Sequence, residues 1–289
     1  ITSLMLDEPV VLFDSDFSSR KIEDFSIGTQ MKQRKKSCNL EKIPHSFDEF
    51  LNGLENLNEW SVTLFTSGTT GQPKKISHTF QSITRGIKVS EKYNNHVWGW
   101  AYNATHMAGI QVFFQALLNR NPLVSLFGNS QKDILSAIKN YKVSHLSATP
   151  TFYRMLLPVE KPIRSVRTIT FGGERIDKKL RTTLENAFPE AKFRNVYAST
   201  EAGSLFSSEG AYFKISDRFK DLIKFEDNEL CLHKTLLGTS ENISTSGSWY
   251  KTGDLVDFSP DNPDYFKFLS RKNEMINVGG YDVNPHEVE

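Results

Sequence analysis

Short apolar segments and single helix-like segments alternate along most of the chain, from Trp60 to about Phe206. The apolar segments are rich in β-branched residues, which is typical of buried strands. Strands connected by single helices run parallel, and helices then cover the faces of their sheet. The alternation therefore predicts the α/β class, with parallel sheets flanked by helices. The expected strands are Ser61–Phe65, Val97–Tyr102, Pro122–Phe127, Val143–Ala148, Val166–Phe171 and Phe193–Ala198. The expected helices are about Thr79–Tyr93, about Gly109–Leu118, Gln131–Tyr141 capped by Ser130, and a helix to Phe188 capped by Asp177.

The two ends of the α/β region carry different patterns. Before it, Pro9–Asp14 predicts a short buried strand, and Ser46 with Glu49 forms a capping box that begins a helix. After it, strand-like segments are separated by Gly, Asn, Pro and Ser turns, which predicts a small β-rich, barrel-like subdomain. These later segments are Asp221–Lys234, Trp249–Phe258 and Tyr265–Leu269.

Composition excludes several classes of protein. The chain has 35 Lys and Arg against 34 Asp and Glu, and this net charge of +1 gives no field that would attract nucleic acid or an anionic membrane. The basic cluster Lys32–Lys36 is better explained as a solvated loop than as a phosphate site. Cys38 and Cys231 are too few for a disulfide framework. No apolar run approaches the roughly 20 residues of a membrane span, and no signal peptide is recognisable. We expect a cytoplasmic globular protein without a nucleic-acid partner or a membrane span.

A glycine- and threonine-rich loop follows the expected strand Ser61–Phe65. Glycine lets the backbone turn tightly and present its N–H groups to an anion, and the hydroxyl and lysine side chains add further donors. The loop residues that we assign to phosphate binding are Thr66, Ser67, Gly68, Thr69, Thr70, Gly71 and Lys74. The spacing differs from the P-loop of NTPases, and an ordinary flexible turn would have a similar composition. The loop alone therefore indicates, without establishing, a polyphosphate site.

Three further segments follow this loop in a recognisable order. They are Asn195–Gly203, Trp249–Leu255 and Ser270–Glu289. Together with the loop, they make the chain from about residue 60 to 289 resemble the adenylate-forming superfamily: acyl- and aryl-CoA synthetases, firefly luciferase and peptide-synthetase adenylation domains. The resemblance implies that ATP activates a carboxylic acid. The carboxylate attacks the α-phosphate, pyrophosphate leaves, and the acyl-adenylate passes its acyl group to a thiol.

The resemblance also implies a role for individual residues. Both reactants are anions, so Mg²⁺ would share the neutralisation of charge, with Glu201 as its protein ligand and Thr200 beside the phosphate. His106 would lie near the acyl carboxylate, although a core or surface histidine is a fair alternative. The implied adenine and ribose site consists of Gly172, Gly173, Glu174, Asn195, Tyr197, Ala198, Ser199, Asp254 and Arg271, with Tyr197 stacked on the base. The implied acyl pocket consists of Tyr102, His106, Met107, Gly109, Phe171 and Ala198.

The chain departs from the family pattern at its ends and in its pocket. Only about 60 residues precede the loop, so we expect a shortened N-terminal segment, residues 1–60. Residues 61–205 would form the nucleotide- and acyl-binding core and residues 206–270 the β-rich subdomain. Residues 271–289 would hold the hinge residue Asn273 and the start of a C-terminal domain that the chain lacks. Asp282 stands where a basic residue is common, and Ala198 replaces a frequent glycine, which would shorten the acyl cavity.

The identity of the acid is constrained by the segment Tyr102–Ile110, which contains no carboxylate to pair with the ammonium group of an amino acid. An unpaired ammonium in a buried pocket would cost several kcal/mol, so a small or medium acid without that group is favoured. The acyl acceptor is CoA in the reading that we favour, and the phosphopantetheine of a carrier protein is the alternative. A non-catalytic nucleotide-binding remnant stays open because the family's catalytic lysine belongs to the C-terminal domain.

Overall fold

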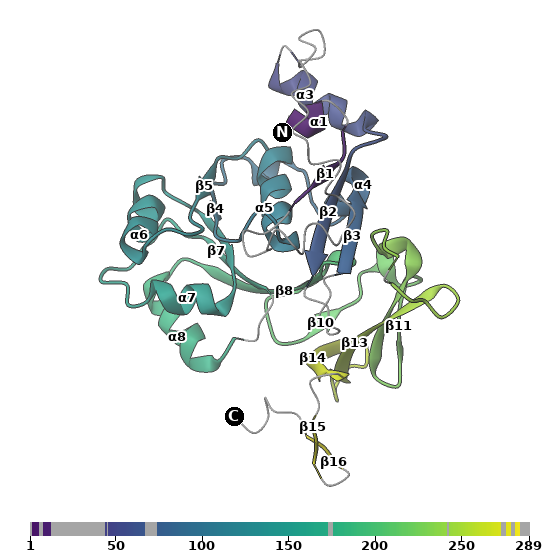
Figure 1. The fold of residues 1–289 in the computed structure, drawn as a ribbon. Helices are drawn as coiled ribbons and strands as arrows, with labels where there is room; N and C mark the ends of the chain where they lie inside the picture. The colour runs from purple at the N-terminus through teal and green to yellow at the C-terminus, as the bar shows by residue number, and fades with distance from the viewer. Residues whose placement is uncertain are drawn as a thin grey trace, which may run out of the picture.

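The computed structural model describes residues 2–5, 8–12, 44, 46–66, 74–172, 176–241, 243–272, 276–278 and 281–283. Its strands form four sheets (Figure 1). The largest has six strands in the order β5-β4-β6-β7-β8-β9. These strands are β4 (Trp98–Trp100), β5 (Leu123–Ser125), β6 (His145–Ala148), β7 (Thr168–Gly172), β8 (Lys192–Ser199) and β9 (Gly203–Ser208). Neighbouring strands from β5 to β8 run parallel, as the sequence predicts, whereas β9 runs antiparallel to β8.

Helices cover both faces of this sheet. Three of them pack on one face: α6 (Gln131–Asn140), α7 (Pro150–Leu156) and α8 (Lys178–Ala187). Each begins at a residue whose side chain accepts a backbone N–H, and these residues are Ser130, Thr149 and Asp177. The helix α5 (Met107–Leu118) lies on the side of the sheet away from α7 and α8 (Figure 1). The structure thus confirms the α/β class.

The strand expected at Ser61–Phe65 forms, but it belongs to a separate three-stranded sheet. The sheet contains β1 (Val10–Val11), β2 (Ser61–Thr66) and β3 (Lys74–Thr79). The strand β2 pairs parallel with β1 and antiparallel with β3, so the glycine-rich loop joins the two strands of a hairpin. A second apolar core lies on this sheet, with residues from α5 and from α1 (Thr2–Met5), α3 (Phe47–Gly53) and α4 (Phe80–Thr84).

The helix expected at about Thr79–Tyr93 is wrong over most of its length, because α4 ends at Thr84. The chain turns at Arg85 and Gly86, and a Cβ added at Gly86 would lie 3.3 Å from the backbone oxygen of Ser204. Glycine disfavours the interior of a helix, so Gly86 is a local signal for this end, and its close approach to β9 lies just beyond α4. The capping box is confirmed, since Ser46 Oγ accepts from the Glu49 N–H at 3.0 Å.

The β-rich region is a five-stranded antiparallel sheet, and its apolar core also contains Ala202, Leu205 and Phe206 from the β8–β9 turn and β9. Its strands are β10 (Phe213–Lys214), β11 (Ile223–Glu226), β12 (Glu229–His233), β13 (Trp249–Phe258) and β14 (Tyr265–Arg271). Short 3-10 turns, η2 (Leu54–Asn56), η3 (Glu91–Tyr93), η4 (Asp217–Phe219) and η5 (Lys234–Leu236), join other elements. A two-stranded sheet of β15 (Ile276–Val278) and β16 (Tyr281–Val283) follows. Within the described residues, no helix is both long and apolar enough to cross a membrane.

A pair of stacked histidines marks the edge of the six-stranded sheet where β4 and β6 begin. The His96 and His145 rings lie 3.8 Å apart between centroids, and His145 Nδ1 is 2.9 Å from Ser144 Oγ. A shallow cleft at this edge is lined by both histidines and by Arg167, Glu190 and Lys192, among others. Burial, followed by the charges of His96 and Arg194, lowers the pKa of His145 to about 4.

This lowered pKa predicts a loss of stability in mild acid. Between pH 6.5 and about 4 the unfolded state takes up a proton at His145 that the folded state does not bind, so stability falls as pH falls through this window. With allowance for solvent screening, we expect a penalty of about 1–2 kcal/mol at pH 5. His145→Gln should reduce the difference between the urea unfolding free energies at pH 7.5 and pH 5.0. An unchanged difference would show that other groups cause the acid sensitivity.

Candidate functional site

The turn that joins β8 to β9 carries the predicted metal ligand. Thr200 and Glu201 form this turn at the carboxyl end of β8, and both are half-buried. Ser199 Oγ accepts from the Ala202 N–H at 3.2 Å and so closes the turn. Gly203 follows with φ of 71°, a left-handed conformation that favours glycine, and its Cα approaches the Gln111 side chain of α5. The turn is therefore fixed by local bonds rather than left as an open loop.

Asp254 on β13 is the centre of a buried polar group that reaches this edge. Its side chain accepts from Tyr197 Oη at 2.5 Å and from Arg271 Nε at 2.8 Å. Asp254 is only 6% exposed, so its negative charge is compensated by these two donors. Burial, followed by the charge of Asp254, raises the pKa of Tyr197 well above its ordinary value. The structure thus joins three residues of the predicted ribose and adenine site, from β8, β13 and β14.

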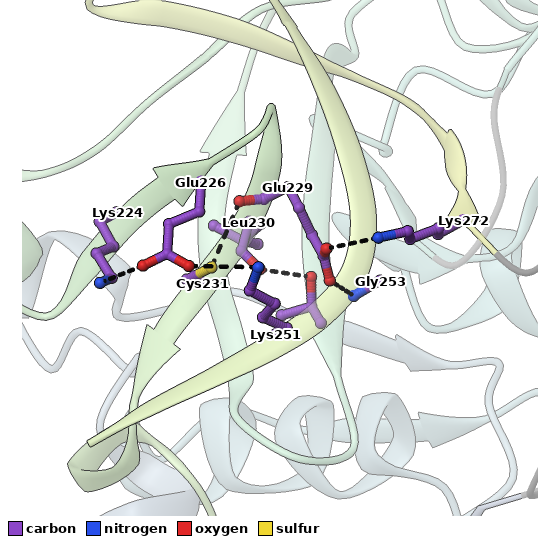
Figure 2. A network of polar contacts seen from close by, with 9 residues as sticks. Lys224, Glu226, Glu229, Leu230, Cys231, Lys251, Gly253 and Lys272 are labelled. Carbon is purple, nitrogen blue, oxygen red and sulfur yellow. Dashed lines mark hydrogen bonds and ion pairs between the residues drawn. The ribbon is translucent and has the colours of Figure 1, made fainter. Parts of the chain in front are cut away.

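A second carboxylate, Glu229, holds the turn that presents Asp254. Glu229 is 4% exposed and accepts from the Gly253 N–H at 2.9 Å, while Lys272 Nζ lies 3.6 Å from its other oxygen (Figure 2). Gly253 has φ of 80°, and the Asp254 N–H donates to Thr252 Oγ1 at 3.0 Å. No sequence pattern singles out Glu229, because it lies 24 residues before Gly253 and meets it only across paired strands.

The charge of Glu201 acts on the same polar group. Burial, followed by the charge of Glu201, raises the pKa of Tyr250 to about 12, and the charge of Arg271 opposes this rise. Glu201 also acts on Tyr197, although more weakly than Asp254 does. The geometric link is β8, which carries Tyr197, bonded to Asp254, and ends at the Thr200–Glu201 turn. Tyr250, half-buried on β13, is a site residue that the sequence analysis did not include.

The strands that hold the glycine-rich loop meet the Thr200–Glu201 turn. Thr66 and Lys74 pair with each other at the ends of β2 and β3, and residues 67–73 lie outside the described residues. His78 of β3 contacts the Thr200 carbonyl oxygen through Nε2 at 2.7 Å. This contact brings the base of the phosphate-loop hairpin to the carboxyl edge of the six-stranded sheet. The predictions for Ser67, Gly68, Thr69, Thr70 and Gly71 fall on residues that are not described.

The predicted acyl-pocket residues divide between two places. His106 is exposed at the start of α5, followed by the buried Met107, and Tyr102 precedes them. The Tyr102 hydroxyl lies against Gly172, because a Cβ added there would be 3.1 Å from it. Phe171 is 2% exposed and packs with Tyr153 and Phe193 in the core beneath the sheet, apart from the core that contains Met107.

The predicted adenine residues are placed in part. The Asn195 amide donates to the Gly210 carbonyl at 2.8 Å, so this side chain is already bonded. The Tyr197 ring stacks on Phe268 with centroids 4.1 Å apart, and any base that stacks on Tyr197 must therefore use its opposite face. Ala198 and Ser199 end β8 beside the Thr200 turn. Gly173, Glu174 and the hinge residue Asn273 lie outside the described residues.

The fold and these positions define an α/β protein whose charged side chains gather at the carboxyl ends of its parallel strands, where ligands bind in open α/β sheets. The same edge holds contributions from the three-stranded and the five-stranded sheets. The chain belongs to the AMP-binding enzyme family, whose profile matches residues 16–221. This membership confirms the resemblance to adenylate-forming enzymes.

Relatives and solved structures agree with this assignment. The chain is 25% identical over 262 residues to a 2-succinylbenzoate–CoA ligase of Staphylococcus epidermidis, covering 81% of this chain and 54% of that protein. It is 23% identical to 4-coumarate–CoA ligase-like 9 of Arabidopsis thaliana, covering 98% of this chain and 58% of that protein. The chain thus spans about half the length of these curated relatives. The O-succinylbenzoate Coenzyme A synthetase of Bacillus subtilis, solved with ATP and magnesium ion, has a TM-score of 0.63 at 23% identity, covering 79% of this chain and 53% of that one.

Proposed function

We propose that this chain is the AMP-binding part of an ATP-dependent acid–thiol ligase that activates a small or medium carboxylic acid and transfers its acyl group to CoA. The observation that carries the proposal is the meeting of three chain segments at one sheet edge. The Thr200–Glu201 turn contacts the phosphate-loop hairpin through His78, and three residues before Thr200 the Tyr197 hydroxyl donates to Asp254 of the five-stranded sheet. A bound nucleotide must contact its phosphate, metal and ribose groups at sites that lie close together. At this junction the phosphate-loop hairpin, Glu201 and Asp254 could supply these three contacts.

The proposed roles follow from the chemistry of each group. The loop 66–74 would hold the β- and γ-phosphates with backbone N–H groups and Lys74. Asp254 would accept from the ribose hydroxyls, and Arg271 would keep its carboxylate oriented. In this arrangement a carboxylate oxygen of the acid forms a bond to the α-phosphorus as the bond to pyrophosphate breaks. The thiol of CoA then takes the acyl group, and AMP leaves.

The residues at the turn fit a magnesium site. Glu201 is a half-buried carboxylate next to the Thr200 hydroxyl, and Mg²⁺ is held in such sites by one or two carboxylates together with substrate phosphates. Bound there, the ion would supply neutralisation of phosphate charge during the displacement. Hydrogen bonds hold the backbone at and after Glu201, because its carbonyl accepts from the Gly238 N–H and the Ala202 N–H donates to Ser199 Oγ. The Cα atom from which the carboxylate extends is therefore well positioned. The succinylbenzoate synthetase that shares this fold was solved with ATP and magnesium ion, which agrees with the assignment.

The proposal assigns residues 61–205 to nucleotide and acyl binding and residues 206–270 to the β-rich subdomain that presents Asp254. His106, Tyr102 and Gly109 would form the acyl side, where the Tyr102 hydroxyl, in the segment before α5, lies against Gly172 at the end of β7. The acid class is taken from two observations. The segment Tyr102–Ile110 has no carboxylate for an amino group, and the 2-succinylbenzoate–CoA ligase among the relatives is named for an aryl acid.

The test is ATP–pyrophosphate exchange by the full natural polypeptide, with a panel of short, aryl, long-chain and α-amino acids. We expect exchange that requires Mg²⁺ and one of the short or aryl acids, followed by thioester formation when CoA is added. Calorimetric titration with ATP on the same sample separates binding from catalysis. Tight ATP binding without exchange for any acid would favour a non-catalytic nucleotide-binding protein, and efficient use of long-chain fatty acids alone would contradict the small pocket.

A further inference from the structure

His78 is a buried histidine at the point where three sheets meet, and none of the roles described above uses it. It lies on β3, is 1% exposed, and bonds at both ring nitrogens. Its Nδ1 is 2.7 Å from Ser82 Oγ, and its Nε2 is 2.7 Å from the carbonyl oxygen of Thr200, which is 122 residues away in the sequence. A buried histidine that spans this separation joins the phosphate-loop hairpin to the turn of the proposed metal ligand.

The two contacts fix the chemical state of His78. A carbonyl oxygen can only accept, so Nε2 must carry the proton and donate to Thr200. The Ser82 hydroxyl then donates to the unprotonated Nδ1. Burial lowers the pKa of His78, which favours the same neutral form. The ring is thus held in one tautomer and one orientation, with its donor aimed at the turn.

A neighbouring contact completes the hold on Glu201. The Gly238 N–H donates to the Glu201 carbonyl at 2.7 Å, and Ser77 and Thr239 exchange backbone hydrogen bonds beside it. Gly238 packs so closely on His78 that an added Cβ would lie 2.7 Å from the ring. The peptide units before and after Glu201 are therefore both bonded, through the Thr200 carbonyl on one side and the Glu201 carbonyl on the other. The backbone on both sides of Glu201 is thus anchored, and its side-chain torsions then determine where the carboxylate points.

We propose that His78 is a positioning residue: by donating to the Thr200 carbonyl it sets where the Glu201 carboxylate stands relative to the β2–β3 hairpin, and thereby sets the affinity for magnesium in the nucleotide complex. This inference rests on the proposed function of Glu201. It concerns only the metal- and phosphate-dependent part of nucleotide binding. The adenosine part depends on Asp254 and Tyr197, which the Glu229-supported turn holds independently.

The test compares substitutions that keep or remove the donor at the Nε2 position. His78→Leu removes it, and His78→Asn keeps a polar group near Ser82 but is too short to reach Thr200. His78→Gln places an amide N–H close to the lost Nε2 and should restore the contact. His145→Leu is the matched control, because His145 is also a neutral histidine bonded to a serine hydroxyl but lies at the opposite edge of the sheet.

Two titrations of the full chain read out the effect: ATP binding as a function of Mg²⁺ concentration, and AMP binding in EDTA. We expect His78→Leu and His78→Asn to raise the Mg²⁺ concentration for half-maximal ATP binding about 10- to 100-fold, the usual cost of losing a partner that orients a metal ligand. AMP affinity should stay unchanged, and His78→Gln and His145→Leu should match the wild type.

The outcomes separate this inference from the proposed function. Folded His78→Leu and His78→Asn proteins with the wild-type Mg²⁺ requirement would overturn the positioning role, as would an equal loss of ATP and AMP binding. Either of the two variants suffices if the other does not fold. A wild-type protein that binds no ATP would instead overturn the proposed function and this inference with it.

Discussion

Glu201→Ala is expected to reduce magnesium-dependent ATP–pyrophosphate exchange by at least about 10²- to 10³-fold, the cost of losing one preorganised electrostatic group in a reaction between two anions. In the proposed site the carboxylate of the acid approaches the phosphates of ATP. Without the metal ligand, the repulsion between these anions is left uncompensated. The loss should fall on the exchange rate at saturating ATP. Exchange assays over a range of Mg²⁺ concentrations measure it.

The control for this substitution is Glu209→Ala. Glu209 follows β9 on the same chain segment, is exposed, and forms a surface ion pair with Arg194 at 3.3 Å. Removing an exposed ion pair of this kind changes the stability of the fold very little, so the control variant should catalyse exchange at the wild-type rate. Wild-type exchange by Glu201→Ala as well would remove Glu201 from the metal site.

Gly109→Ala is expected to have the largest effect on stability. Gly109 lies in the first turns of α5, and an added Cβ would be 2.1 Å from the backbone oxygen of Asn103 and 2.8 Å from its carbonyl carbon. Backbone cannot swing aside as a flexible side chain would, so the segment before α5 must move. Overpacking of this severity costs about 3 kcal/mol or more. Urea unfolding monitored by circular dichroism measures the change.

Gly53→Ala is the matched substitution in another helix. Gly53 ends α3, has helical backbone angles, and has no atom within 4 Å of an added Cβ. Alanine there should leave stability unchanged or raise it by about 0.4–1 kcal/mol, because the unfolded chain loses freedom. An equally small effect of Gly109→Ala would mean that the Asn103 backbone can move away from α5 at little cost in free energy.

Most of the secondary structure could be predicted because periodicity and capping are local properties. The strands β6, β7 and β8 and the helices α6 and α8 follow directly from buried apolar patterns and from Ser130 and Asp177. Strand pairing is not local. Ser61–Phe65 has the pattern of one more parallel strand, yet β2 pairs with β1 from the far N-terminal segment and with β3.

The site could be predicted only where a recognisable motif contains the residue. Glu201, Asp254 and Arg271 stand in such segments, and the structure places them in one polar neighbourhood. The residues that hold them could not be found this way. Glu229 and His78 act through backbone groups that lie 24 and 122 residues away, and neither has a neighbouring residue that would mark it. Their roles depend on register and on the packing of sheets, which a single sequence does not display.

The apolar core of the five-stranded sheet does not end at that sheet. Ala202, Leu205 and Phe206, from the β8–β9 turn and β9, are buried in it together with Leu232 and Phe266. The turn that carries Glu201 is therefore anchored by apolar packing on one side and by the hydrogen bond from His78 to Thr200 on the other. Separating the five-stranded sheet from the six-stranded one would expose this apolar surface to water, which is costly. We therefore expect the two sheets to move as one unit while ligands enter and leave.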